Sequence, residues 1–172
     1  MPWRRRRTGV AVAVFALSAL VLSGCSSEKK DPRAYPGSPA GQTLEGVLKT
    51  FGLQLPPCEV QGVGYSGSSK EPYQKLSLSF RAPKACVDQY LRDHSADPGK
   101  PAHWSPGADP KAARLVSDAD AAKYGWSFDG ATKYELFTGF ATANQSTFAV
   151  LVDPRDPVET VYLDSTYLGG SS

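Results

Sequence analysis

The sequence has no strong charge of either sign. Its 172 residues carry 19 Lys and Arg against 17 Asp and Glu, a net charge of +2. Four of the basic residues, Arg4 to Arg7, precede a segment that we expect to be removed, and taking these four from the 19 leaves 15 basic against 17 acidic residues. So small an imbalance argues against a strongly basic nucleic-acid binder. The charged fraction of 21% and the apolar fraction of 41% exclude wholesale disorder.

The sequence also lacks an apolar run long enough to cross a membrane comfortably. Gly9 to Leu22 is its longest run, 14 residues without a charge, whereas a spanning helix needs about 20 residues. The run follows the basic start Met1 to Thr8, and its length is typical of the apolar region of a secretory signal peptide. We therefore expect residues 1–24 to be a signal peptide that is removed on export.

A tetrapeptide at the end of this run indicates how the chain is processed. Leu22-Ser23-Gly24-Cys25 matches the bacterial lipobox, and with the basic start and the apolar run it resembles a bacterial lipoprotein precursor. The resemblance implies that the Cys25 thiol receives diacylglycerol and that a peptidase then cleaves before Cys25. Acyl chains on Cys25 would hold the protein on the extracytoplasmic face of the cell membrane, because stable anchoring takes two hydrophobic signals. The alternative is a cysteine at the end of a membrane anchor, and the arginines leave Sec and twin-arginine export both open.

The remaining chain predicts a tether and one domain. Residues 25–40 contain three prolines among small and charged side chains, a composition typical of a flexible tether. Residues 41–168 then form a single domain, large enough to bury a core of its own, and residues 169–172 form a disordered tail.

Hydrophobic periodicity predicts an α+β domain. Helical spacing begins after Thr43, after Pro83 and after Ser117. Strands are expected over residues 59–65, 73–81, 133–142, 147–153 and 158–167. Because the links between the last three strands are short, neighbouring strands should be antiparallel. We expect a five-stranded antiparallel sheet covered on one face by two or three helices, with Leu78, Phe80, Val150 and Val161 buried.

Cysteine usage predicts one disulfide. Apart from Cys25, the chain has only Cys58 and Cys86, an even pair in an exported domain. If Ser66 faces Tyr73 across a hairpin turn, Cys58 lies opposite Arg81, about one helical turn from Cys86. The alternative, a redox or metal-bound pair, lacks the Cys-x-x-Cys spacing and the neighbouring histidines that such sites use.

Other motifs lack the context that their chemistry needs. The glycine pattern from Gly62 to Gly67 precedes a strand, not the helix that would bind a phosphate. His94 and His103 are the only histidines, and the sequence assigns them to a helix end and a loop. Asp118 and Asp120 follow Ser117 and fit the first turn of a helix. We therefore predict no catalytic residue, no metal site and no cofactor.

Aromatic residues are the remaining candidates for a function. His103 and Trp104 lie in a loop rich in proline and glycine, and Tyr124 and Trp126 precede the C-terminal strands. Such side chains usually pack in a core, but exposed ones would form a contact surface for an envelope protein or a glycan. The favoured interpretation is a non-enzymatic binding domain of the cell envelope. The alternatives are an envelope hydrolase that uses Asp118, Asp120 and His103, and an inhibitor that presents the loop 95–110.

The layout of the domain carries a second resemblance. Its Leu55-Pro56-Pro57 segment, its first hairpin, Phe80-Arg81-Ala82-Pro83 and Tyr124-Gly125-Trp126 resemble small actinobacterial lipoproteins of unknown function. This resemblance implies no activity, and it leaves the ligand open.

The proposed processing makes one direct prediction. Changing Cys25 to Ser should abolish acylation, because a hydroxyl is a far weaker nucleophile than a thiolate. Metabolic labelling with a radioactive fatty acid should mark the wild-type protein and leave the variant unlabelled. Label on the Cys25→Ser protein would show that the lipobox interpretation is wrong.

Overall fold

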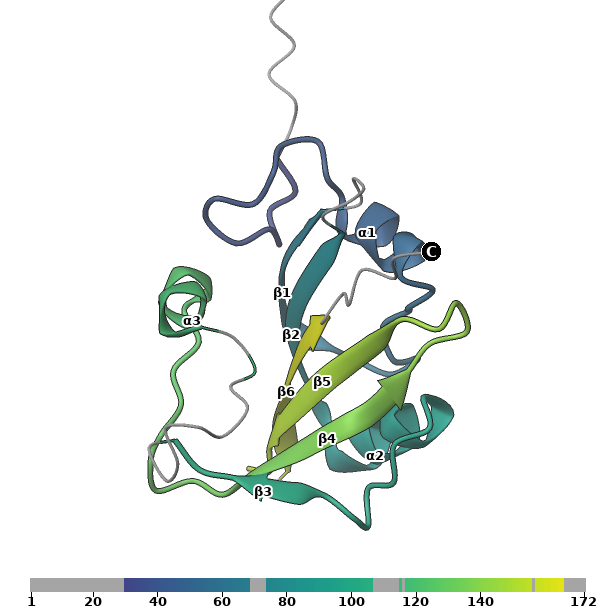
Figure 1. Cartoon of the computed structure of the whole chain (residues 1–172), viewed down its shortest axis with the longest axis vertical. Coiled ribbons are helices and arrows are strands. Elements are labelled where there is room, and N and C mark those ends of the chain that lie inside the picture. The colour runs from purple at the N-terminus through teal and green to yellow at the C-terminus, as the bar shows by residue number, and fades with distance from the viewer. Residues whose placement is uncertain (1–29, 69–73, 107–114, 116, 156, 166–172) are drawn as a thin grey trace, which may run out of the picture.

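The computed structural model describes residues 30–68, 74–106, 115, 117–155 and 157–165 (Figure 1). The expected signal peptide, Cys25 and the expected tail lie outside these ranges. The helices are α1 Leu44–Thr50, α2 Lys84–Asp93 and α3 Asp118–Tyr124. The strands are β1 Gln61–Ser68, β2 Lys75–Pro83, β3 Ala102–Trp104, β4 Tyr134–Ala141, β5 Thr147–Asp153 and β6 Val158–Ser165. They form one antiparallel sheet in the order β1-β2-β6-β5-β4-β3.

The α+β class and the antiparallel sheet confirm the prediction, but the sheet has six strands instead of five. The additional strand, β3, lies in the segment 95–110 that we expected to be a loop. It pairs with β4 through Ala102 opposite Leu136 and Trp104 opposite Tyr134. A strand of three residues is too short to show an alternating pattern, so tertiary pairing and not local sequence determines this strand.

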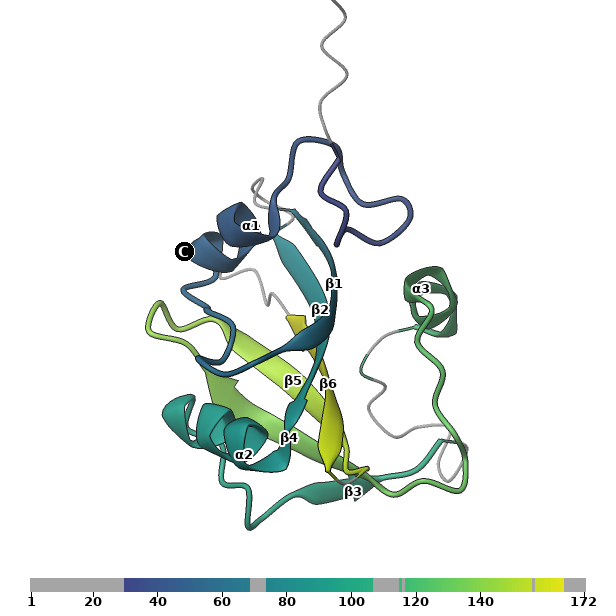
Figure 2. The same cartoon turned by 180° about the vertical axis from the view of Figure 1, so that it is seen from behind.

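The sheet is covered on both faces, where the sequence predicted one. The first face packs against α1 and α2, and α3 lies on the opposite side (Figures 1 and 2). Along β5, Val150 and Val152 belong to the first-face core and Leu151 to the second. The continuous apolar run of β5 is typical of a strand buried on both faces. Leu78, Phe80, Val150 and Val161 are all fully buried on the first face, as predicted.

The first hairpin has a different register from the expected one. Ser66 faces Ser77, β1 continues to Ser68, and β2 begins and ends two residues later than predicted. The shift from Tyr73 to Ser77 is four residues. Because side chains alternate with a period of two, an even shift leaves each β2 residue on the face that the sequence predicted.

The glycines of β1 serve close packing. A side chain at Gly64 would collide with the Tyr35 ring, and a Cβ atom at Gly67 would lie 2.5 Å from a Val47 methyl group of α1. Both glycines lie inside β1, which extends to Ser68, and not at the start of a helix. The glycine pattern therefore lets α1 and the N-terminal segment approach the sheet.

The N-terminal segment differs from the predicted tether. Ala34 forms a parallel bridge with Tyr65 of β1, and the Tyr35 amide donates a hydrogen bond to the Tyr65 carbonyl. Asp31 accepts a hydrogen bond from the Leu44 amide at the start of α1, and Arg33 pairs with it at 2.8 Å. The hydrogen bond from Arg33 holds the pKa of Asp31 well below its usual range. The expected flexible segment 25–40 is therefore wrong for residues 31–38, which pack on the domain.

The first-face core predicts a large effect of one truncation. Phe80→Ala should lower the free energy of unfolding by about 3–5 kcal/mol, because a fully buried ring is lost and a cavity remains. Denaturant melts would measure this, with the exposed β4 residue Thr138→Ala as a control expected to change stability by about 0.5 kcal/mol or less. Equal stabilities of the two variants would contradict the assigned packing.

Candidate functional site

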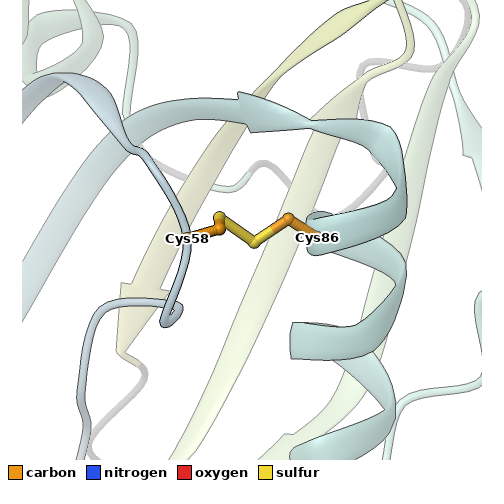
Figure 3. The surroundings of a disulfide bond; sticks show 2 residues. All are labelled: Cys58 and Cys86. Atoms are coloured by element: carbon orange, nitrogen blue, oxygen red, sulfur yellow. A yellow bond between two sulfur atoms is a disulfide. The ribbon is translucent and has the colours of Figure 1, made fainter.

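The predicted disulfide is present and joins the loop before β1 to α2 (Figure 3). The Cα atoms of Cys58 and Cys86 lie 6.5 Å apart. Gln61 takes the place opposite Arg81 that we expected for Cys58. The bond still forms because the chain before Gln61 and the helix after Arg81 leave the hairpin from the same end.

Seven aromatic rings form a continuous cluster on the second face of the sheet, the second-face cluster. Adjacent ring centroids lie between 4.9 and 6.4 Å apart. Its members are Tyr35, Trp104, Tyr124, Trp126, Phe128, Tyr134 and Tyr162. A polar link passes through the cluster, since the Trp126 indole donates to the Tyr35 hydroxyl at 2.8 Å and that hydroxyl lies 2.5 Å from Ser79 Oγ.

The four predicted surface residues separate into two pairs. Tyr124 and Trp126 are 8% and 7% exposed and belong to the second-face cluster, so they pack in the interior. His103 is exposed and Trp104 is half-buried, and both lie on the edge strand β3. Of the proposed contact surface, only the His103 and Trp104 pair is accessible.

Trp104 lies at one corner of the second face, and we call the residues Trp104, Phe128, Asp153 and Arg155 the β3 corner. His103, the preceding residue of β3, pairs with Glu135, so its side chain points to the opposite face of the sheet. The Trp104 ring meets Phe128 edge to face at 5.4 Å and Tyr134 at 5.6 Å. Tyr134 is fully buried and pairs with Trp104 across the strands. The buried tyrosine thus fixes the ring position from below, which makes this corner a rigid aromatic surface.

An ion pair lies at the same end of the sheet. Arg155 Nη2 is 2.5 Å and Nε 2.7 Å from Asp153 Oδ2. The other oxygen, Asp153 Oδ1, is buried and has no hydrogen-bond partner within the described part of the chain. Burial raises the pKa of Tyr162 to about 12, and the nearby Asp153 carboxylate adds to this effect. Sequence reasoning missed this pair because Asp153 to Pro157 reads as a turn.

A second polar cluster lies beneath α3. Ser77 Oγ is 2.5 Å from Asp164 Oδ1 and 3.5 Å from the Tyr124 hydroxyl. Burial raises the pKa of Asp164 to about 6, opposed by the Ser77 hydrogen bond and by Lys75. Lys75 also pairs with Asp120 of α3 at 3.7 Å. The buried cluster joins α3 to β2 and β6.

The other predicted residues have structural roles. Ser117 caps α3 by accepting from the Asp120 amide at 3.1 Å, with Asp118 in the first turn. His94 ends α2, and its ring stacks on Phe140 at 4.4 Å. Within the described ranges, no three His, Cys, Asp or Glu side chains gather in a group that could hold a metal ion. The trio of Asp118, Asp120 and His103 therefore forms no such group.

A groove of about 470 Å³ runs beside α1. Its lining consists of Glu45, Leu48, Lys49, Gly52, Leu53, Gln54 and Leu55. Its far wall is held by the Tyr90 hydroxyl, which donates to the Gln54 carbonyl at 3.0 Å, and by the Thr142 hydroxyl, which donates to the Phe51 carbonyl at 2.7 Å. The groove is a preformed but open concavity, with one carboxylate and one ammonium group on its rim.

Comparison with protein families, with curated proteins and with solved structures finds no match to this chain. In the part of the chain that the structure describes, no helix has the length and apolar character needed to cross a membrane.

The buried Asp164 predicts a specific dependence of stability on pH. Its pKa is 3.8 in an unperturbed carboxyl and about 6 in the folded protein, so the unfolded chain ionises first as pH rises. Stability should fall between about pH 4 and 6, by about 3 kcal/mol for a shift of about two units. Asp164→Asn carries no charge to bury, and its side-chain oxygen can still accept from Ser77. The variant should be more stable than the wild type at pH 7 and similar to it at pH 4.

Denaturant melts at pH 4 and pH 7 would measure this difference. Asp93→Asn is the matched control, because Asp93 is exposed and its replacement should leave the fall in stability unchanged. If Asp164→Asn loses stability between pH 4 and 7 as steeply as the wild type, the fall has another origin.

Proposed function

We propose that this protein is a lipid-anchored binding domain of the bacterial cell envelope, with its ligand surface at the β3 corner. The observation that carries the anchor is the Leu22-Ser23-Gly24-Cys25 lipobox directly after a basic start and an apolar run. The Cys58–Cys86 disulfide supports an oxidising compartment. The rigid, half-buried Trp104 supports a binding surface, because aromatic residues on a fixed scaffold carry much of the energy of many interfaces.

The arrangement of the domain supports a defined orientation. Residues 31–38 are packed on the sheet, so only four residues lie between Cys25 and the first described residue, Lys30, and five Cα-to-Cα steps join the two. Such a stretch spans at most about 17 Å. The first described residues lie at the top of Figure 1 and β3 lies at the bottom. With the lipid at the N-terminal end, the β3 corner would point away from the membrane and into the envelope.

The proposal predicts a Trp104-dependent interaction with cell walls. The lipidated protein in detergent micelles should co-sediment with purified, membrane-free cell walls. Trp104→Ala should weaken this binding by at least tenfold, on the order of 1.4 kcal/mol, because the accessible aromatic surface is removed. Trp104→Phe, which keeps an aromatic ring, should retain part of the binding.

Leu55→Ala in the groove beside α1 is the control for a surface far from the β3 corner and should bind as the wild type does. Near-ultraviolet circular dichroism would establish that each variant keeps its aromatic packing. Wild-type binding by a folded Trp104→Ala protein would rule out the β3 corner as the ligand surface.

A further inference from the structure

The aromatic part of the β3 corner offers flat, fixed ring surfaces. Trp104 and Phe128 are half-buried and stand at 89° to each other, with Tyr134 packed against both. Phe128 also contacts Tyr162 at 5.2 Å. Ring faces held in this way attract weakly polarised C–H groups, and they lose little conformational entropy on binding because they are already ordered.

The polar part of the corner consists of Asp153 and Arg155. The Asp153 side chain is 2% exposed, and its Oδ1 atom has no hydrogen-bond partner within the described residues. A buried hydrogen-bond acceptor without a donor destabilises the protein, so a ligand donor that reaches Asp153 Oδ1 would strengthen binding. The Arg155 side chain is 69% exposed, which leaves it free to swing off the carboxylate. In the observed pair, at most two of the five N–H groups of Arg155 donate to Asp153. The remaining N–H groups can donate to a ligand.

The tyrosines place these two parts together. Tyr134 continues the β4–β5 register opposite Asp153, since Glu135 faces Val152. The same tyrosine is the ring that supports Trp104. Tyr162 packs against Phe128, and its pKa is raised by the charge of Asp153 and lowered by that of Arg155. The aromatic rings and the ion pair therefore border the same corner.

The charges select the class of ligand. A ligand carboxylate would pair with Arg155 but be repelled by Asp153. A ligand ammonium group would pair with Asp153 but be repelled by Arg155. A hydroxyl group is both donor and acceptor, so neutral polyhydroxylated ligands can satisfy both residues at once. A pyranose ring combines such hydroxyls at its rim with an apolar face of C–H groups.

We propose that the β3 corner binds a neutral saccharide chain, whose sugar ring stacks on Trp104 while its hydroxyls bond to Asp153 and Arg155. This inference rests on the proposed function and names the ligand class of the same surface. A protein partner is the competing class, and the experiment separates the two.

The test uses the lipidated protein in detergent micelles and three soluble oligosaccharides at pH 6. These are cellotetraose as the neutral probe, a glucosamine tetramer as the cationic probe and a galacturonate tetramer as the anionic probe. After removal of the signal peptide, Trp104 and Trp126 are the tryptophans of the chain. Because Trp126 is buried, saccharide binding should appear as a saturable change in Trp104 emission.

The neutral probe should bind at least tenfold more tightly than either charged probe. Trp104→Ala should abolish cellotetraose binding, and Asp153→Asn should weaken it at least fivefold because amide donors replace an acceptor. If Asp153→Asn fails to fold, Arg155→Ala at the exposed partner tests the polar half with the same expected loss. Leu55→Ala should leave binding unchanged.

Four outcomes would overturn the inference. Stronger binding of either charged probe would refute the selection by Asp153 and Arg155. Unchanged affinity in both Asp153→Asn and Arg155→Ala would refute the role of the ion pair. Retention of Trp104-dependent binding to cell walls, with no binding of any oligosaccharide at millimolar concentration, would reject a saccharide while the proposed binding function stands. If the wild-type protein binds neither cell walls nor any oligosaccharide, both the saccharide ligand and the proposed binding function are rejected.

Discussion

Burial of the central strands on both faces is the constraint that organises this domain. β2, β6 and β5 lie in the middle of the sheet, with α1 and α2 on one side and the second-face cluster on the other. A polar side chain on these strands cannot point to bulk water, so each must find a partner inside. Ser77 meets Asp164 and Ser79 meets Tyr35 for this reason.

The acidic residues of these strands show how that constraint is met at the sheet ends. Glu159 is 2% exposed and lies 3.5 Å from Lys84, an exposed residue at the start of α2. Burial raises the pKa of Glu159, and Lys84 acts against this rise. Asp153, which is buried, pairs with the exposed Arg155 in the same way. In both cases an exposed cation pairs with a buried carboxylate, which satisfies a charge without burying its partner.

Local sequence predicted the elements well and their surroundings less well. β5 has the expected bounds, α3 begins after Ser117 and ends at a left-handed Gly125, and the disulfide is the expected one. These features depend on alternation, capping and cysteine count, which are local signals. Three features depend on partners distant in sequence, and no local periodicity predicts them: the packing of the second face, the strand β3 and the packing of residues 31–38. Trp104 of the proposed surface was found by its aromatic composition, whereas Asp153 resembled an ordinary turn residue.

The order of the strands has a consequence for the time at which the domain can fold. β6, the last strand among the described residues, lies between β2 and β5, and its contacts with β2 join residues up to 89 positions apart. Without β6 the strands divide into one pair, β1-β2, and one trio, β5-β4-β3, each with an apolar edge open to aggregation. Pairing at such sequence separations makes folding slow. Because a chain is synthesised from its N-terminus, the joining strand is made last, and the sheet can close only after residues 158–165 have been made.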